Sequence, residues 1–339
     1  MKHILETQEL EEFSQAYKPE LNYLGDVLFP NRKYDSFQFA WEIIAGKDLL
    51  PVAAEVSALD AEAPIRQRPD AKRITAETML IKHKINLTEH ASRIKNHGVG
   101  SDKVKEVIFD DVDNLYRGVR ARVEAMKMEL LANGYVTVKE NNINKVVDYE
   151  YPTANIFITD LTDTRADVVE LVEKVKIAAA SNGKEITYAV CSSKVINLLF
   201  KNTQLTTLWK NSAVTLPSPT KSAFKTFLEG LFEIAIIEYN EQYRYENADG
   251  SYGQSRFYPE DRITFVAGEA GAALGVGAFA PTPEEEMLDD SVILDGYAVA
   301  TLWDEKDPAA QWTKVSAENL PIVKDVDSFY IVYTEAFNR

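Results

Sequence analysis

The stretch from Ser101 to Gly134, SDKVKEVIFDDVDNLYRGVRARVEAMKMELLANG, decides the fold of this chain. Its apolar residues recur every three or four positions, the period of one face of an α-helix. Ser101 or Asp102 is suited to cap the start, and Asn133-Gly134 to end it. We therefore predict one helix of roughly 30 residues, about 45 Å long. Its apolar stripe comprises Val104, Ile108, Val112, Leu115, Val119, Val123, Met126 and Leu130.

Two further features belong to this helix. Gly118 lies in its middle, where glycine costs about 1 kcal/mol relative to alanine, and close packing against another element is one reason to keep it. Directly after the helix we expect a β-hairpin, with Tyr135–Lys139 paired to Lys145–Tyr149 around Asn141-Asn142.

The segment before the helix, residues 34–87, is expected to be strand, turn, strand. Phe37–Ile43 and Met79–Leu87 alternate apolar and polar side chains, as half-buried strands do. A connection this long without a helical period is either a projecting β-hairpin or a functional loop. It carries a local basic cluster of Arg66, Arg68, Lys72 and Arg73.

Residues 1–33 are expected to form an extended arm with a short helix around Gln8–Tyr17. Leu28 and Phe29 end an apolar run that belongs to no long periodic element. Such side chains need a surface to pack on, either their own or a neighbour's.

Residues 154–300 show the pattern of a mixed α/β domain. A helix is expected to open at Thr164-x-x-Asp167, which resembles a capping box. The last forty residues return to strands. The other expected elements are strands Ile156–Thr159, Ile186–Cys191, Glu233–Tyr239, Ile263–Ala267, Tyr297–Trp303, Trp312–Val315 and Phe329–Tyr333, and helices from Ser193 and across Ala223–Leu231.

Charge and composition exclude some functions. The chain has 53 Asp and Glu against 37 Lys and Arg, a net charge of −16, which argues against a surface that grips DNA phosphates. The acidity either keeps the protein soluble or lets it lie near nucleic acid without adhering. No apolar stretch approaches the ~20 residues of a membrane span, and the start of the chain lacks a signal peptide. We expect a soluble protein made in the cytoplasm.

A glycine run is the strongest hint of a nucleotide site. Gly268, Gly271, Gly275 and Gly277 follow an expected strand, and the last two resemble part of a dinucleotide fingerprint. That fingerprint needs a helix to open directly behind it. Here prolines follow at once, and the Glu284–Glu286 run would repel a phosphate. A tight, close-packed loop is the favoured interpretation.

Three other candidate sites are weak. His83, His90 and His97 recur every seven residues but lack the spacing of a metal motif. Cys191 ends an apolar strand, where cysteine usually behaves as a small hydrophobe, although Ser193 could open a helix nearby. The acidic residues 284–286 and 289–290 lack calcium-loop spacing and are expected to form a solvated loop. We predict no catalytic residue, metal or cofactor.

The order of the parts resembles the Hong Kong 97-type phage capsid fold, an α+β fold. The local pattern is similar to that of the lambda-type capsid protein E family of tailed bacteriophages. The resemblance covers most of the chain and is weakest over residues 200–290. It is carried by LPVA (50–53), EAPIRQR (62–68), MLIKHK (79–84), LLANGY (130–135), DPAAQWT (307–313), LPIV (320–323) and DSF (327–329).

This resemblance implies a domain plan. It comprises an N-terminal arm (1–33), an extended loop (34–87), a peripheral domain with a spine helix (88–153 and 301–339, helix 101–134) and an axial domain (154–300). The arm and loop would lie over neighbouring subunits, where the arginines would meet acidic faces; in isolation they would form a solvated loop. The implied intersubunit contacts are Arg66, Arg68, Lys72, Arg73, Leu28 and Phe29.

The resemblance also implies a function. The chain would be a major capsid protein, not an enzyme, which assembles into pentamers and hexamers of an icosahedral head around double-stranded DNA. It would have a scaffold, a portal and a decoration protein as partners, touch DNA only non-specifically, and bind no membrane. It would be part of the virion and assemble in the host bacterial cytoplasm. The alternatives are an encapsulin-like compartment and a soluble α/β nucleotide-binding enzyme.

Overall fold

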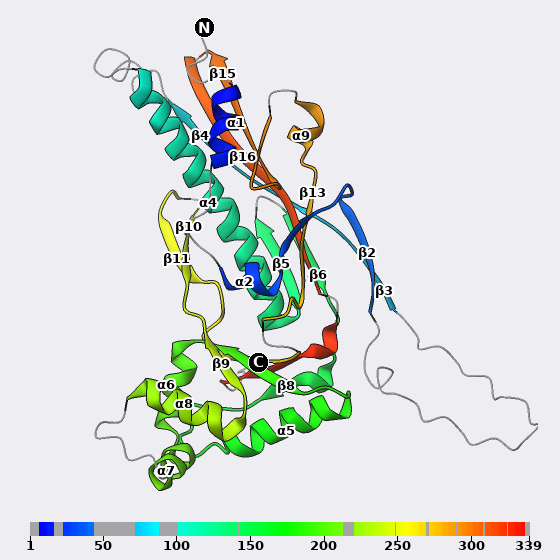
Figure 1. Cartoon of the computed structure of the whole chain (residues 1–339), viewed down its shortest axis with the longest axis vertical. Coiled ribbons are helices and arrows are strands. Elements are labelled where there is room, and N and C mark those ends of the chain that lie inside the picture. The colour runs from blue at the N-terminus through cyan, green and yellow to red at the C-terminus, as the bar shows by residue number, and fades with distance from the viewer. Residues whose placement is uncertain are drawn as a thin grey trace, which may run out of the picture. The chain divides into compact units, whose positions relative to one another are not determined.

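The structure is a computed structural model, shown in Figure 1. Its backbone contacts group the chain into two compact units, one formed by residues 1–39, 75–127 and 275–322, the other by 40–74, 128–274 and 323–339. Helices and strands are mixed in both, so the expected α+β class is confirmed. The structure describes residues 7–16, 23–43, 72–87, 101–140, 143–212, 220–247, 249–268, 271–288, 291–307, 309–323 and 325–335.

The predicted long helix is α4, which runs from Ser101 to Asn133. From Ile108 onward every residue of the predicted apolar stripe is buried. The helix ends where Gly134 adopts a left-handed φ of 75°. A Cβ atom at this position would lie 2.6 Å from the Tyr151 ring. Both the conformation and the close approach therefore require glycine at the end of the helix.

The first unit is built on a six-stranded sheet with the order β1-β13-β16-β15-β14, in which β4 also pairs with β16. β1 pairs with β13 in parallel, whereas β14–β15, β15–β16 and β16–β4 are antiparallel. Residues 101–127 of α4 belong to this unit, and its last residues, 128–133, to the second. The other elements of the first unit are α1 (Thr7–Ala16), α2 (Leu24–Leu28), β1 (Asn31–Lys33), β4 (Met79–Leu87), β13 (Gly275–Ala280), α9 (Pro283–Met287), β14 (Val292–Leu294), β15 (Ala298–Lys306) and β16 (Ala309–Val323).

The strand pairing around the extended loop differs from the simplest expectation. β4 has the predicted bounds, but it pairs with β16 and not with the strand at the start of the loop. That first strand, β2 (Gln38–Ile43), pairs instead with β3 (Lys72–Glu77). β3 escaped prediction because Ile74 is its only large apolar residue, so its period of two is weak. The residues between β2 and β3 lie outside the described part.

The second unit is built on a five-stranded sheet with the order β7-β17-β12-β8-β9. Alternate residues of β12 divide between its faces: Ile263 and Phe265 join an apolar core with α5 to α8, while Thr264 donates to the Leu131 carbonyl. Two hairpins complete the unit, one of them as predicted after α4. Its elements are β5 (Tyr135–Glu140), β6 (Ile143–Asp148), η2 (Thr153–Asn155), β7 (Ile156–Ile158), α5 (Val168–Ser181), β8 (Ile186–Cys191), α6 (Ser193–Lys201), α7 (Thr203–Asn211), α8 (Lys221–Phe232), β9 (Ala235–Glu238), β10 (Gln242–Glu246), β11 (Tyr252–Arg256), β12 (Arg262–Ala267), η3 (Val326–Ser328) and β17 (Phe329–Tyr333).

The start of α5 corrects the predicted capping box. The helix begins at Val168, and Asp167 caps it by accepting a hydrogen bond from the Glu170 amide at 2.9 Å. Thr164 lies before the helix, where its carbonyl accepts from the Thr203 amide. Aspartate is as good an N-cap as threonine, so the sequence pattern alone did not separate them.

The predicted domain boundaries stay a prediction. The contacts group the chain differently near the C-terminal end of the expected axial domain. Strands β13 and β14, which lie within the predicted range 154–300, belong to the sheet of the first unit.

Candidate functional sites

The predicted basic cluster lies mostly outside the described residues. Arg66 and Arg68 fall in a part of the chain that the structure does not describe, and Lys72 is described only as the first residue of β3. Arg73 follows it and is exposed. The structure therefore shows one of the four side chains, in a position open to a partner. Their role in contacts between subunits stays a prediction.

Leu28 and Phe29 are buried within their own unit, at 1% and 0% exposure. They end α2, and the Phe29 ring approaches Gly275 of β13 so closely that a Cβ there would lie 2.9 Å from the ring. Their own unit thus already supplies a surface for them. A contact of these two residues with another subunit stays a prediction, which their burial does not favour.

A buried cluster of charges connects α2 to α4, and sequence reasoning missed it. The Asp26 carboxylate accepts from Arg120 at 2.7 Å and from Lys127 at 3.0 Å. The Lys127 ammonium also donates to Asn31 Oδ1 at 2.7 Å. These four residues, together with Glu124, are called the α2–α4 clasp below. Only a fold could reveal it, because its partners lie about a hundred residues apart.

The Glu124 carboxylate completes the clasp from the same helix. It accepts from the Gly25 amide at 3.0 Å, and a Cβ at Gly25 would lie 2.2 Å from its second oxygen. A glycine in α2 therefore lets the backbone approach the carboxylate. The clasp holds residues 25–31 against α4 by charge-assisted hydrogen bonds.

In the clasp, burial and ion pairing act in opposite directions on the pKa of Asp26 and on that of Lys127. Burial alone would raise the pKa of Asp26, but the attraction of Lys127 and Arg120 keeps it below its usual value. Burial lowers the pKa of Lys127, while Asp26 and Glu124 oppose that shift. The ion pairs thus compensate groups that would be costly to bury alone.

The glycine run does not form a phosphate loop. Gly275 and Gly277 lie inside strand β13, where a Cβ at Gly275 would lie 2.0 Å from the Ile322 carbonyl oxygen and one at Gly277 2.9 Å from Asn31 Oδ1. Close packing was expected here, but in a loop. Gly268 and Gly271 have nothing within 4 Å of a Cβ. No helix opens directly behind the run, since β13 continues to Ala280.

The structure corrects the expected solvated acidic loop for Glu284 and Glu285. Glu286 is exposed, and residues 289–290 lie outside the described part of the chain. Residues 283–287 form α9, and Glu284 is buried. Its carboxylate accepts from Lys314 at 2.6 Å and from Ser316 at 2.9 Å. Glu285 pairs with Lys33. The lysines that pair with Glu284 and Glu285 lie on strands far away in the sequence, so charge density alone predicted the wrong environment for these two residues.

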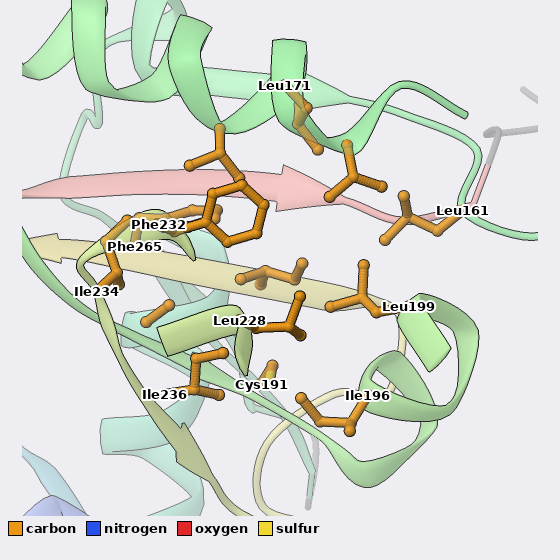
Figure 2. Close-up of a pocket in the computed structure, with 14 residues that line it drawn as sticks. Leu161, Leu171, Cys191, Ile196, Leu199, Leu228, Phe232, Ile234, Ile236 and Phe265 are labelled. Carbon is orange, nitrogen blue, oxygen red and sulfur yellow. The ribbon is translucent and has the colours of Figure 1, made fainter. Parts of the chain in front are cut away.

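Cys191 lines an apolar cavity in the core of the second unit (Figure 2). The cavity has a volume of about 40 Å³, and apolar side chains from α5, α6, α8 and the sheet surround it, among them Leu171, Leu199, Leu228 and Phe265. Burial raises the pKa of the Cys191 thiol to about 12, with a smaller contribution from Glu238. The group stays a neutral thiol at physiological pH, which fits a hydrophobic role and not a nucleophile.

The histidine series does not come together in the described part of the chain. His83 is exposed on β4, whereas His90 and His97 lie outside the described residues. In that same part, no three side chains of His, Cys, Asp or Glu are arranged as metal ligands. None of the described helices is long and apolar enough to span a bilayer.

Comparisons with known proteins give the family. A family model of phage major capsid protein E matches residues 6–333. A search of curated proteins found no match.

Solved structures give the fold. The protein assigned as a prophage capsid protein of E. coli CFT073 is 15% identical, with 97% of this chain and 99% of that chain covered and a TM-score of 0.62. A phage-related protein from Bordetella bronchiseptica RB50 is 13% identical, with 96% of both chains covered and a TM-score of 0.57. The mature capsid of bacteriophage PhiM1 is 8% identical, with 94% and 88% covered and a TM-score of 0.51.

These similarities confirm the expected Hong Kong 97-type capsid fold at the level of the whole chain. The family match extends over nearly all of the sequence, including both compact units. The chain therefore belongs to the phage major capsid protein E family and is the major capsid protein of a phage head.

Proposed function

We propose that this chain assembles into pentamers and hexamers that close an icosahedral head around double-stranded DNA. The observation that carries the proposal is the family match over residues 6–333. The net charge of −16 supports it, because an acidic wall lets packaged DNA lie close without adhering. Repeated contacts in a closed array add up, so no single interface need be strong.

The proposal includes partners and place. A scaffold protein would guide assembly in the host bacterial cytoplasm, a portal would occupy one vertex, and a decoration protein would bind the outer surface. We also propose that the chain is purely structural. The neutral Cys191 thiol and the strand conformation of Gly275 and Gly277 support this, because they leave the thiolate and phosphate-loop hypotheses without a basis.

The extended loop is proposed to carry contacts between subunits. Arg66, Arg68 and Arg73 would meet carboxylates of the next subunit, and the exposure of Arg73 supports this. Reversal of their charge should lower the yield of shells without unfolding the subunit. The same three changes would leave assembly intact if the loop were merely solvated.

Particle imaging tests the main proposal. The chain, expressed with the scaffold gene of its own phage, should give closed shells or shell fragments. A stable, monodisperse monomer under all conditions would overturn the proposal. An encapsulin-like compartment shares the fold, so the cargo separates the two: nuclease-protected DNA supports a phage head, and enclosed enzyme supports a compartment.

A further inference from the structure

Two tryptophans stack on one face of the six-stranded sheet. Trp303 of β15 and Trp312 of β16 are paired in register, with ring centroids 6.0 Å apart and planes 10° from parallel. The Trp312 indole donates to Glu305 at 2.7 Å. Trp303 remains 36% exposed. Large aromatic rings left open to solvent on a sheet are candidates for a contact surface.

One lysine of the neighbouring strand β4 contacts this pair, and a second lies on the same side of that strand. The Lys84 ammonium lies 4.1 Å from the centroid of the Trp312 ring, a cation–π contact. Lys82 is two residues away on the same strand and is exposed, so it points to the same side of the sheet. In the described part of the chain, neither ammonium has a carboxylate within ion-pair distance. Lys82, Lys84, Trp303 and Trp312 are called the tryptophan–lysine face.

A neighbouring part of this side of the sheet is covered by α9. Lys314 is paired in register with Lys84, but its ammonium binds Glu284 of α9 at 2.6 Å. Ser316, two residues further along β16, binds the same carboxylate and is buried. The cover provided by α9 therefore reaches Lys314 and Ser316 but leaves the tryptophan–lysine face open.

On the opposite side of the sheet, residues of β16 face the protein interior. Val315 and Ala317, which alternate with Lys314 and Ser316, are completely buried. On β4, His83 of the same side is exposed, but its imidazole lies close to α4, 3.6 Å from where a Cβ at Gly118 would be. The tryptophans and the two lysines thus occupy the side that points away from α4. β4, β16 and β15 run side by side in Figure 1.

The chemistry of the face selects its partner. Tryptophan is the residue type most typical of binding hot spots, and unpaired ammonium groups at the edge favour carboxylates. The chain itself carries an excess of carboxylates, with a net charge of −16, and it belongs to a family that builds shells from copies of one protein. DNA also offers negative charge, but the rest of the chain would repel it.

We propose that the tryptophan–lysine face docks onto an acidic surface of a second copy of this chain. The inference rests on the proposed self-assembly and adds to it the surface and its chemistry. The tryptophans would supply the desolvated centre of the contact, and Lys82 and Lys84 would pair with carboxylates at its rim.

Zero-length carbodiimide cross-linking tests this on shells of the unaltered chain. Shells assembled from a mixture of isotope-labelled and unlabelled copies distinguish bonds within a copy from bonds between copies. We expect Lys82 or Lys84 to be joined to an Asp or Glu of another copy, and tryptophan emission to change on assembly. Shells with neither signal would overturn the inference, while failure to form any shell would instead contradict the proposed function.

A double variant with two charge reversals provides the second test of the inference. Lys82→Glu with Lys84→Glu should lower the yield of shells about tenfold or more, while circular dichroism shows a folded subunit. Lys201→Glu with Lys221→Glu, two exposed lysines of the other unit, makes the same change of charge and should assemble normally. Equal yields for both pairs would overturn the inference. So would normal shells that only retain less DNA, because DNA would then be the partner.

Discussion

The Lys127 ammonium lies 3.0 Å from the Asp26 carboxylate, and the lysine side chain is completely buried. This pair joins the short helix α2 to the long helix α4 within the first unit. The cation could not be left there alone, because a buried charge without a partner is strongly destabilising. Stability of the first unit should therefore depend on a single aspartate near the start of the chain.

Asp26→Ala removes the shared partner of Lys127 and Arg120. We expect the free energy of unfolding to fall by about 3 kcal/mol, measured by denaturant unfolding of the unassembled subunit. Asp35→Ala is the control, because Asp35 is exposed on the same segment and should change stability by less than about 0.5 kcal/mol. Equal effects of the two changes would show that the clasp contributes nothing.

Gly275 and Gly118 predict opposite outcomes for the same substitution. Alanine at 275 would place its Cβ 2.0 Å from the Ile322 carbonyl oxygen, a backbone atom that cannot move without disturbing β16. Gly275→Ala should destabilise the subunit by about 3 kcal/mol or more.

Gly118→Ala should stabilise the subunit by up to about 1 kcal/mol. Its Cβ would lie 3.6 Å from the His83 ring, an ordinary contact distance, and alanine favours the helix. Close packing within one chain therefore does not explain this glycine. Thermal unfolding of both variants checks the pair, and a loss of stability for Gly118→Ala would mean that α4 and β4 lie closer together than described.

The Cys191 thiol should react very slowly with alkylating reagents until the second unit unfolds. Burial raises its pKa to about 12, so almost no thiolate exists at pH 8, and the cavity around it has an apolar lining. An alkylating reagent should modify the native subunit more slowly than the denatured one by a factor of about a hundred or more. Rapid modification of the native protein would reopen the question of a reactive thiol.

The same cavity predicts how substitutions at Cys191 differ. Cys191→Ser places a hydroxyl among aliphatic side chains and should cost about 1–3 kcal/mol. Cys191→Val keeps the site apolar, adds volume next to an empty space of about 40 Å³, and should be close to neutral. Denaturant unfolding distinguishes them. Similar free energies of unfolding for the two variants would indicate that a polar group lies within reach of the thiol.

The sequence alone predicted those elements whose periodicity is strong. The bounds of β4, β8 and β17 agree with expectation, and α4 differs by one residue at its end. β13 was missed because Gly275, Gly277, Ala278 and Ala280 give no alternation of large apolar and polar residues. A strand of small residues looks like a loop until the backbone that approaches it, at Ile322, is known.

The functional surfaces were harder to predict, for a related reason. The clasp and the ion pair between Glu284 and Lys314 join residues that lie far apart in the sequence. No local sequence pattern therefore predicts either of them. The tryptophan–lysine face was partly predictable, since Trp303 and Trp312 lie on strands that the sequence predicted. What the sequence did not show was the register that stacks the rings and the helix α9 that covers only part of the sheet.

The fold raises the pKa of Glu318, whereas it lowers that of Asp26. We therefore expect the charge of Glu318 to destabilise the folded subunit at neutral pH. Burial raises the pKa of Glu318, and repulsion from Glu286 and Glu284 adds to this, although Thr78 donates to the carboxylate at 2.9 Å. A carboxylate with a raised pKa in the folded state destabilises that state at neutral pH, where it is ionised. Glu318→Gln removes the charge and keeps an oxygen that can accept from Thr78.

The variant should therefore be more stable than the unaltered chain at pH 7, by less than about 1 kcal/mol because the group is only half-buried. The difference should shrink as the pH falls through the raised pKa and vanish below the ordinary value of 4.5, where the glutamate is neutral in both states. Denaturant unfolding across pH 4 to 8 measures it, with the exposed Glu246→Gln as the control. A gain that persists unchanged at low pH would mean that the amide packs better than the acid and that charge is not the cause.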